Sequence, residues 1–175
     1  MGTPIISRGS TTRNGDLQSG SGATTLASSG LGRFNVDWQA RTASHDGWRT
    51  SPEELLAAAH SACFAMQLSH ELTQNGTRPT QLDATAEVTF VPGTGINGIH
   101  LDVTARVLGI LTDDFRRIAE SAAVHCPLTQ ALAGTEITLT TTLAQAYPVH
   151  GPGSGAATTA GDPARRGRDA HPLKI

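Results

Sequence analysis

The segment that begins at Ser51 constrains the fold most, because it carries both a start signal and a stop signal for a long helix. Ser51 suits the N-cap, Pro52 suits the first helical position, and Glu54 can close a capping box. The following residues are rich in Ala, Leu and Met as far as about Asn75-Gly76, where the glycine favours a helix end. Helical spacing places six of them on one side: Leu55, Leu56, Ala59, Ala62, Cys63 and Met66. The sequence therefore predicts a long helix with Cys63 on its buried face.

Short strands are expected on either side of this helix. The first third of the chain is rich in Gly, Ser and Thr and has a turn signal at Asn14-Gly15-Asp16, which predicts a hairpin or meander. After the helix, apolar residues alternate over 82–90 and again over 99–107. The link Pro92-Gly93-Thr94-Gly95 turns the chain back between them, so we expect the two strands to pair antiparallel.

The second half predicts one more helix and one more strand. Thr112 can cap a helix that ends near His125, because Pro127 disfavours the helical conformation at Cys126. Cys126 then stands before a short turn that Pro127 begins, and a last strand follows over 137–143. The class is α+β, with antiparallel sheets around a long central helix that carries Cys63. We expect one domain over residues 1–147 and a disordered tail over 148–175, which lacks any apolar period.

Composition excludes several classes of function. The net charge of −2 gives no electrostatic case for binding nucleic acid. No apolar run approaches the roughly 18 residues of a membrane span, and the N-terminus does not resemble a signal peptide. These features predict a cytoplasmic protein. Two cysteines in a reducing compartment do not make a disulfide scaffold, so they either pack in the core or do chemistry together.

A reactive Cys63 would need a cation beside it, because burial alone raises a thiol pKa and silences it. Arg41 and Arg49 both lie in the polar loop just upstream of the helix. One guanidinium at about 4 Å supplies on the order of 4 kcal/mol at an effective dielectric near 20. Lowering a thiol pKa by about two units takes roughly 2.7 kcal/mol. A single arginine is therefore sufficient.

Two other kinds of site use residues close to the cysteines. His60 and Cys63 are one helical turn apart, and His125 precedes Cys126, so a zinc site with two cysteines and two histidines is conceivable. The spacing is not that of a zinc finger. A hydrolase in which His60 or His125 activates Cys63 is another alternative, although no third orienting group is evident.

Two cysteine motifs in order give the chain a resemblance to the OsmC/Ohr family, the osmotically inducible and organic-hydroperoxide-resistance proteins. The run from Thr50 to Met66, with Ala-His-Ser-Ala-Cys at 59–63, resembles the first signature of that family. His125-Cys126-Pro127-Leu128, with Gln130-Ala131-Leu132 downstream, resembles the second. The similarity covers about residues 10–146, and the details of the first motif look more like the OsmC branch than the Ohr branch.

The resemblance implies a thiol-dependent peroxidase that reduces organic hydroperoxides under oxidative or osmotic stress. Cys63 would be the peroxidatic cysteine, Cys126 the resolving one, Glu53 the acidic residue and Arg41 its arginine, with Arg49 the alternative. The family fold is an intertwined homodimer, no metal or other cofactor is implied, and a lipoyl-type dithiol would be the reductant. The remaining alternatives are a non-enzymatic stress protein with a structural cysteine pair and the zinc-binding module.

Overall fold

A meander of three short strands opens the chain. Strands β1 (Ser10–Asn14), β2 (Ser21–Thr25) and β3 (Arg33–Asp37) pair antiparallel in that order. Gly15 turns the first hairpin with φ of 80°, a backbone conformation that glycine adopts without steric cost. The predicted meander is confirmed.

The computed structural model describes residues 2–43, 47–144 and 169–171. They fall into two compact units, the first drawn from the described residues up to 58 together with 88–97, and the second from 59–87 together with the described residues from 98 onward. Besides the meander, the first unit holds the short helix α1 (Gln39–Thr42) and the start of α2 (Pro52–Gln74). Among the described residues, no helix is long and apolar enough to cross a membrane.

Helix α2 begins and ends where the sequence predicts. The hydroxyl of Ser51 accepts a hydrogen bond from the backbone N–H of Glu54 at 3.1 Å, which caps the first turn. The Glu54 carboxylate accepts a hydrogen bond from the Thr50 hydroxyl at 2.5 Å, whereas a capping box would direct it to the Ser51 N–H. At the other end Gly76 has φ of 81°, and the next N–H bonds back to the carbonyl of Leu72 at 3.0 Å.

The buried face of α2 differs from the predicted one. The fully buried residues of α2 form a row at four-residue spacing within the second unit: His60, Phe64, Leu68 and Leu72. Ala59 and Ala62 are exposed, Met66 is 69% exposed, and Cys63 lies at the border between the two faces. Apolar side chains lie on more than one side of this helix, so their periodicity alone could not select the side that packs inward.

Strands β4 (Pro79–Val91), β5 (Gly95–Val107), β6 (Glu136–Leu143) and β7 (Asp169–His171) form the second sheet in that order. A tight turn after Val91 joins β4 to β5, so these neighbours run antiparallel, as predicted. Strand β6 pairs parallel with β5, from Gly98 opposite Glu136 to Ala105 opposite Leu143. The prediction of purely antiparallel sheets is therefore wrong for this sheet, because the chain returns through helices before it enters β6.

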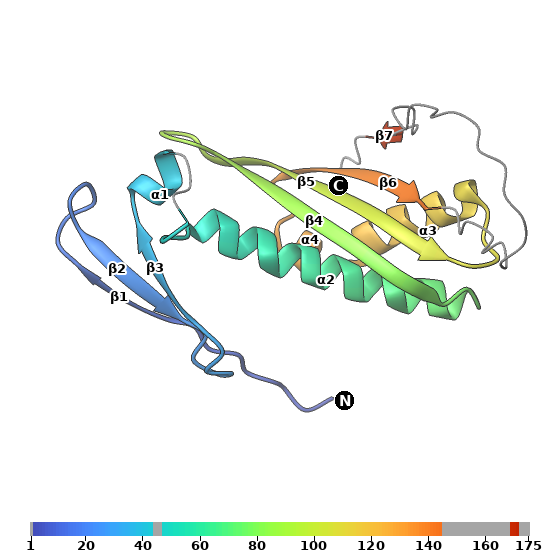
Figure 1. The fold of residues 1–175 in the computed structure, drawn as a ribbon, viewed down its shortest axis with the longest axis horizontal. Coiled ribbons are helices and arrows are strands. Elements are labelled where there is room, and N and C mark those ends of the chain that lie inside the picture. The colour runs from blue at the N-terminus through green and yellow to red at the C-terminus, as the bar shows by residue number, and fades with distance from the viewer. Residues whose placement is uncertain (1, 44–46, 145–168, 172–175) are drawn as a thin grey trace, which may run out of the picture. The chain divides into compact units, whose positions relative to one another are not determined.

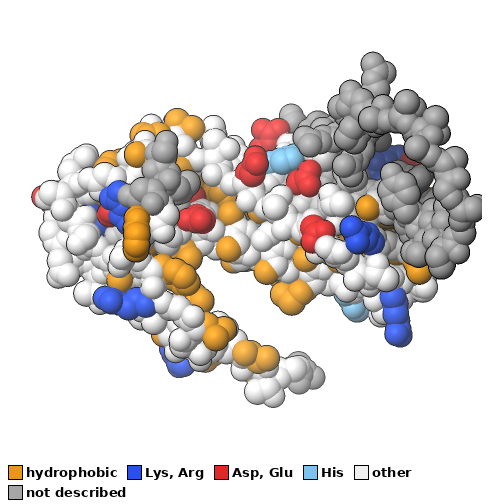
Figure 2. All heavy atoms as spheres, viewed as in Figure 1, with side chains coloured by type: hydrophobic (Ala, Val, Ile, Leu, Met, Phe, Trp, Pro, Cys, Tyr) orange, Lys and Arg blue, Asp and Glu red, His pale blue; other side chains and the backbone are white. Residues whose placement is uncertain are grey.

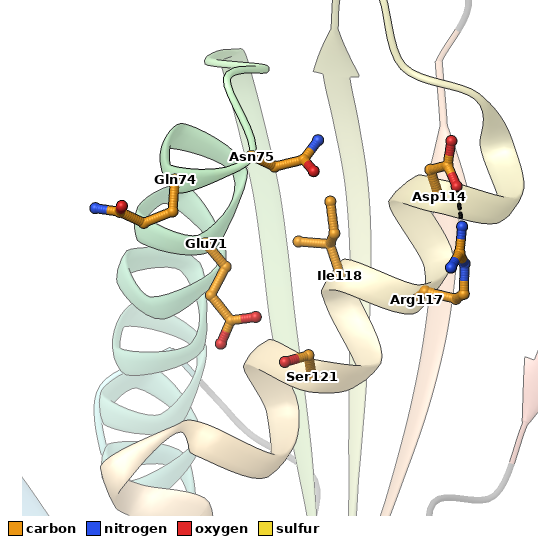
Figure 3. Close-up of a pocket in the computed structure, with 7 residues that line it drawn as sticks. All are labelled: Glu71, Gln74, Asn75, Asp114, Arg117, Ile118 and Ser121. Atoms are coloured by element: carbon orange, nitrogen blue, oxygen red, sulfur yellow. Dashed lines mark hydrogen bonds and ion pairs between the residues drawn. The ribbon is translucent and has the colours of Figure 1, made fainter.

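Helices α3 (Thr112–His125) and α4 (Pro127–Ala131) make that return. Figures 1 and 3 show α3 near the second half of α2, and in Figure 3 strands of the second sheet lie behind both helices. The predicted end of α3 is confirmed, since Cys126 leaves the helical conformation with ψ of 122° just before Pro127. The N-cap is Leu111 and not Thr112.

The core of the second unit combines the buried row of α2 with side chains from α3 and from the sheet. The α3 contribution is Phe115, Ala119, Ala122 and Ala123, and the sheet contributes Ile99, Leu101, Val103, Ala105, Ile137 and Leu139. The predicted alternation of β5 is confirmed. The predicted tail over 148–175 lies outside the described residues, except for the three residues of β7.

Candidate active site

Arg41 and Glu53 form a close ion pair in the first unit. The Arg41 Nη2 atom lies 2.5 Å from Glu53 Oε1, and Nε donates to both carboxylate oxygens at 3.1 Å. Glu53 stands in the first turn of α2 and is only 7% exposed. A paired guanidinium satisfies a buried carboxylate in the geometry that arginine favours. The structure thus brings together the two residues that the family resemblance pairs.

Two aromatic rings hold the guanidinium of Arg41 in place. Its central carbon lies 4.2 Å from the centroid of the Phe90 ring and 5.5 Å from that of Trp38. These rings pack edge to face, with centroids 6.2 Å apart. Arg49, the alternative candidate, binds Asp37 at 2.8 Å. The cation–π contacts were not predicted, although Trp38 comes one helical turn before Arg41 and could have suggested one of them.

Cys63 and Cys126 meet in the second unit, and both are free thiols. Pro127 ends α3 and begins α4, which leaves Cys126 between the two helices and fully buried. The Cys63 thiol lies within interaction range of the Cys126 side chain, and the backbone N–H of Leu128 donates to the Cys63 sulfur. Two residues that are 63 positions apart in sequence thus become direct neighbours.

These surroundings favour the protonated form of Cys63. Burial raises the pKa of the Cys63 thiol, and the neighbouring Cys126 side chain raises it further, in part through charge repulsion. The Leu128 N–H acts in the opposite direction, because it stabilises the thiolate. These neighbours alone do not favour the thiolate. Cys63 therefore needs a positive group in addition to them if it is to react as a thiolate at neutral pH.

His60 is completely buried on α2, one helical turn before Cys63. Its Nε2 atom hydrogen-bonds the hydroxyl of Thr129 at 2.9 Å, and both side chains are completely buried. The Nδ1 atom of His60 is buried and has no hydrogen-bond partner among the described residues. Burial lowers the pKa of His60, so its ring is neutral near pH 7. The sequence gave no local signal for this contact, because its partners are 69 residues apart.

His125 lies on the surface beside the second half of α2. Its Nδ1 atom is 3.4 Å from Glu71 Oε1 and 3.3 Å from the Ser121 hydroxyl. Figure 3 shows Glu71 and Ser121 facing each other across a polar groove between α2 and α3. The residues that line this groove include neither cysteine. We therefore assign the groove no role in the chemistry of the cysteines.

The histidine contacts do not support the zinc or hydrolase alternatives. His60 directs its Nε2 atom to Thr129, and His125 faces Glu71, so neither is among the groups that act on the pKa of Cys63. Across the part of the chain that the structure describes, no three side chains of His, Cys, Asp or Glu gather as a metal site. What the geometry does provide is a pair of adjacent thiols with different exposure.

Comparison with known proteins identifies the family. Residues 44–142 match the family described as OsmC-like protein. The chain is 36% identical to peroxiredoxin OsmC of Escherichia coli over 138 residues, which are 77% of this chain and 94% of that protein. The chain belongs to the OsmC-like family. The expected resemblance is thus confirmed.

A comparison with other relatives favours the OsmC branch within this family. Organic hydroperoxide resistance protein-like 1 of Staphylococcus epidermidis is 29% identical over 92 residues, or 51% of this chain and 66% of that protein. The match to the OsmC protein is both higher and longer. A crystal structure of an organic hydroperoxide resistance protein from Elizabethkingia anophelis shares the fold, with a TM-score of 0.60 at 23% identity, covering 82% of this chain and all of that one.

Proposed function

We propose that this OsmC-like protein reduces organic hydroperoxides to alcohols, with Cys63 as the attacking thiolate and Cys126 as its resolving partner. The observation that carries the proposal is that the two free thiols lie close enough to interact, although they are 63 positions apart in the sequence. Family membership supports the enzyme class, since the E. coli relative is named a peroxiredoxin and the S. epidermidis relatives are named for organic hydroperoxide resistance.

The reaction divides into three balanced steps. The Cys63 thiolate attacks the outer oxygen of the hydroperoxide and the O–O bond breaks, so that Cys63 becomes a sulfenic acid and an alkoxide leaves, which takes a proton from water to become the alcohol. The Cys126 sulfur then attacks the Cys63 sulfur, which releases water and forms a disulfide. A dithiol, which we propose to be lipoyl-type, returns two electrons and two protons through a mixed disulfide. No step requires a metal or an organic cofactor.

Different exposure gives the two cysteines different roles. Cys63 is partly exposed at the border of the apolar surface formed by Ala59, Ala62 and Met66. Cys126 is fully buried, so a peroxide in solution reaches Cys63 first. An alkyl substituent that contacts this surface gains about 0.8 kcal/mol for each methylene that it buries. Hydrogen peroxide lacks such a substituent, so we propose that organic hydroperoxides are preferred.

Activation of Cys63 is assigned to Arg41, held by Glu53. A guanidinium beside the sulfur opposes the effect of burial on the pKa of the thiol. Ten residues separate Glu53 from Cys63 in α2, which is nearly three helical turns. We propose that the Arg41 beside a given Cys63 comes from a second copy of the chain. We propose that the active site is completed in a homodimer.

The outer surface of α2 supports the same proposal. Figure 2 shows hydrophobic side chains at the surface along this helix, and Met66 is 69% exposed there. The small side chains of Ala59 and Ala62 are exposed on the same side. Such a surface suits close contact with another chain.

Residues 1–147 would form this peroxidase domain, acting in the cytoplasm in the response to oxidative or osmotic stress.

Single cysteine substitutions test the roles. Cys63→Ser should abolish peroxide consumption, because no thiolate remains to attack. Cys126→Ser should consume about one equivalent of cumene hydroperoxide and then stop as the sulfenic acid or its over-oxidised forms. Peroxide consumption with a dithiol reductant, followed by intact-protein mass, measures both. Turnover by Cys63→Ser together with loss of the single event in Cys126→Ser would reverse the assignment.

A further inference from the structure

The short helix α4 depends on other parts of the protein for its position. It has only five residues, which is too short for a helix to be stable by itself in water. Its N-cap residue, Cys126, makes no side-chain capping bond. Thr129 is the one residue within α4 that is buried. The contacts of Thr129 therefore have a large influence on where α4 lies.

Two hydrogen bonds connect α4 to α2 at adjacent points. One joins His60 to the hydroxyl of Thr129, and the other joins the Leu128 N–H to the Cys63 sulfur. His60 and Cys63 are one turn apart on α2, and Leu128 and Thr129 are consecutive on α4. Cys126 precedes this pair by two residues, so a change in the position of α4 also moves the resolving sulfur.

The tautomer of His60 follows from its surroundings. A neutral imidazole carries one N–H, and a buried N–H without a partner costs more than a bare nitrogen lone pair. Since Nδ1 is the nitrogen without a partner, the proton belongs on Nε2. Nε2–H then donates to Thr129 Oγ1 at 2.9 Å. The bond uses the far nitrogen of the ring, a position that the amide of a glutamine can also reach and that of an asparagine cannot.

From these contacts we infer that His60 is a positioning residue which, through Thr129, holds Cys126 at Cys63 and so stabilises the Cys63–Cys126 disulfide. The inference rests on the proposed two-cysteine chemistry and extends it to a residue with no direct contact to substrate. A fixed α4 raises the effective concentration of one sulfur at the other. Loss of the His60–Thr129 bond lowers that concentration and makes the disulfide easier to reduce.

Two matched pairs of variants test the inference. Thr129→Val removes the hydroxyl and keeps the side-chain volume, whereas Thr129→Ser keeps the hydroxyl. His60→Asn loses the donor at the Nε2 position, whereas His60→Gln keeps it. The measurement is the equilibrium between the Cys63–Cys126 disulfide and a dithiothreitol redox buffer, followed by thiol trapping and mass. If Thr129→Val does not fold, the His60 pair decides.

Thr129→Val and His60→Asn should shift that equilibrium about tenfold towards the reduced protein, which is about 30 mV for two electrons. Thr129→Ser and His60→Gln should stay near the wild type. In ¹⁵N NMR spectra, His60 of the wild type should show the Nε2–H tautomer. Equal potentials in all four variants, whether or not their melting temperatures fall, would overturn the inference and leave a packing role.

The redox equilibrium separates this inference from the proposed function. It needs no hydroperoxide, so a shift in Thr129→Val would support the positioning role even in a protein without peroxidase turnover. A wild type that turns over cumene hydroperoxide, with a potential that does not respond to Thr129→Val, would contradict the positioning role alone.

Discussion

Arg41 binds both carboxylate oxygens of Glu53, and its guanidinium lies over the ring of Phe90 at 4.2 Å. The centroid of the Trp38 ring also lies 5.5 Å from the central carbon of the guanidinium, so Arg41 has one carboxylate and two aromatic rings as neighbours. Such a guanidinium loses little freedom when it binds an anion. This arrangement suits a group whose role is to stabilise a thiolate, and the role can be tested.

Arg41→Ala should raise the pKa of Cys63 towards the free value of about 8.5, because burial of the thiol is then opposed only by the Leu128 N–H. The rate of alkylation by iodoacetamide, measured against pH in a Cys126→Ser background, reports that pKa. Arg49→Ala is the matched control, since Arg49 binds Asp37. An unchanged profile in Arg41→Ala with a shifted one in Arg49→Ala would transfer the role to Arg49.

Mixed dimers should show whether two copies complete one site. A dimer of one Arg41→Ala chain and one Cys63→Ser chain has a single site with both groups intact if the arginine comes from the other copy. It should retain about half the activity of the wild-type dimer, given two equivalent sites related by symmetry. Each parent homodimer should be inactive or strongly impaired.

A second mixed dimer serves as the control for this experiment. A dimer of Cys63→Ser with Cys126→Ser should lack turnover, because both cysteines of one site belong to the same chain. Inactivity of the first mixed dimer would show that each chain supplies its own arginine, contrary to the proposal.

Stability should fall as the pH drops below about 6.5, in part because of His60. Burial lowers the pKa of His60 in the folded protein, so the unfolded chain binds a proton that the folded chain does not. The contribution is complete above the unfolded pKa of about 6.5 and is lost as the pH falls towards the folded pKa, by at most about 1.4 kcal/mol for each pH unit.

His60→Gln removes this titration while it keeps a donor for Thr129. Urea unfolding at pH 7.5 and at pH 5.5, at one protein concentration, should therefore show a smaller loss of stability in His60→Gln than in the wild type. An equal loss in the two proteins would mean that His60 is protonated in the folded state as easily as in the unfolded one.

Local signals in the sequence predicted the ends of the elements that carry the site. Ser51 and Pro52 mark the start of α2, Gly76 marks its stop, and Pro127 separates α3 from α4 at Cys126. Each of these helix ends depends on the backbone preferences of one or two nearby residues, and these can be read from the sequence. The place of Cys126 between the end of α3 and the segment that Pro127 begins could therefore be predicted without a structure, whereas the helical form of that segment, α4, was not predicted.

Contacts between distant segments could not be predicted in the same way. Apolar residues surround α2, so the inward position of Phe64 and the outward position of Met66 depend on the sheet that α2 packs against. The parallel pairing of β6 depends on the course of the chain through α3 and α4. The bond between His60 and Thr129 joins two residues with no shared local pattern. Pairing of the two cysteines was expected only from the family resemblance, which supplies long-range information of this kind.

The most direct test of the two-cysteine account is a peptide map of the protein after one equivalent of cumene hydroperoxide. The map is made without reduction, after free thiols have been blocked. The account predicts loss of two hydrogens for each chain and a disulfide between Cys63 and Cys126 of the same chain. Free thiols at both positions, or a bond between chains, would contradict it.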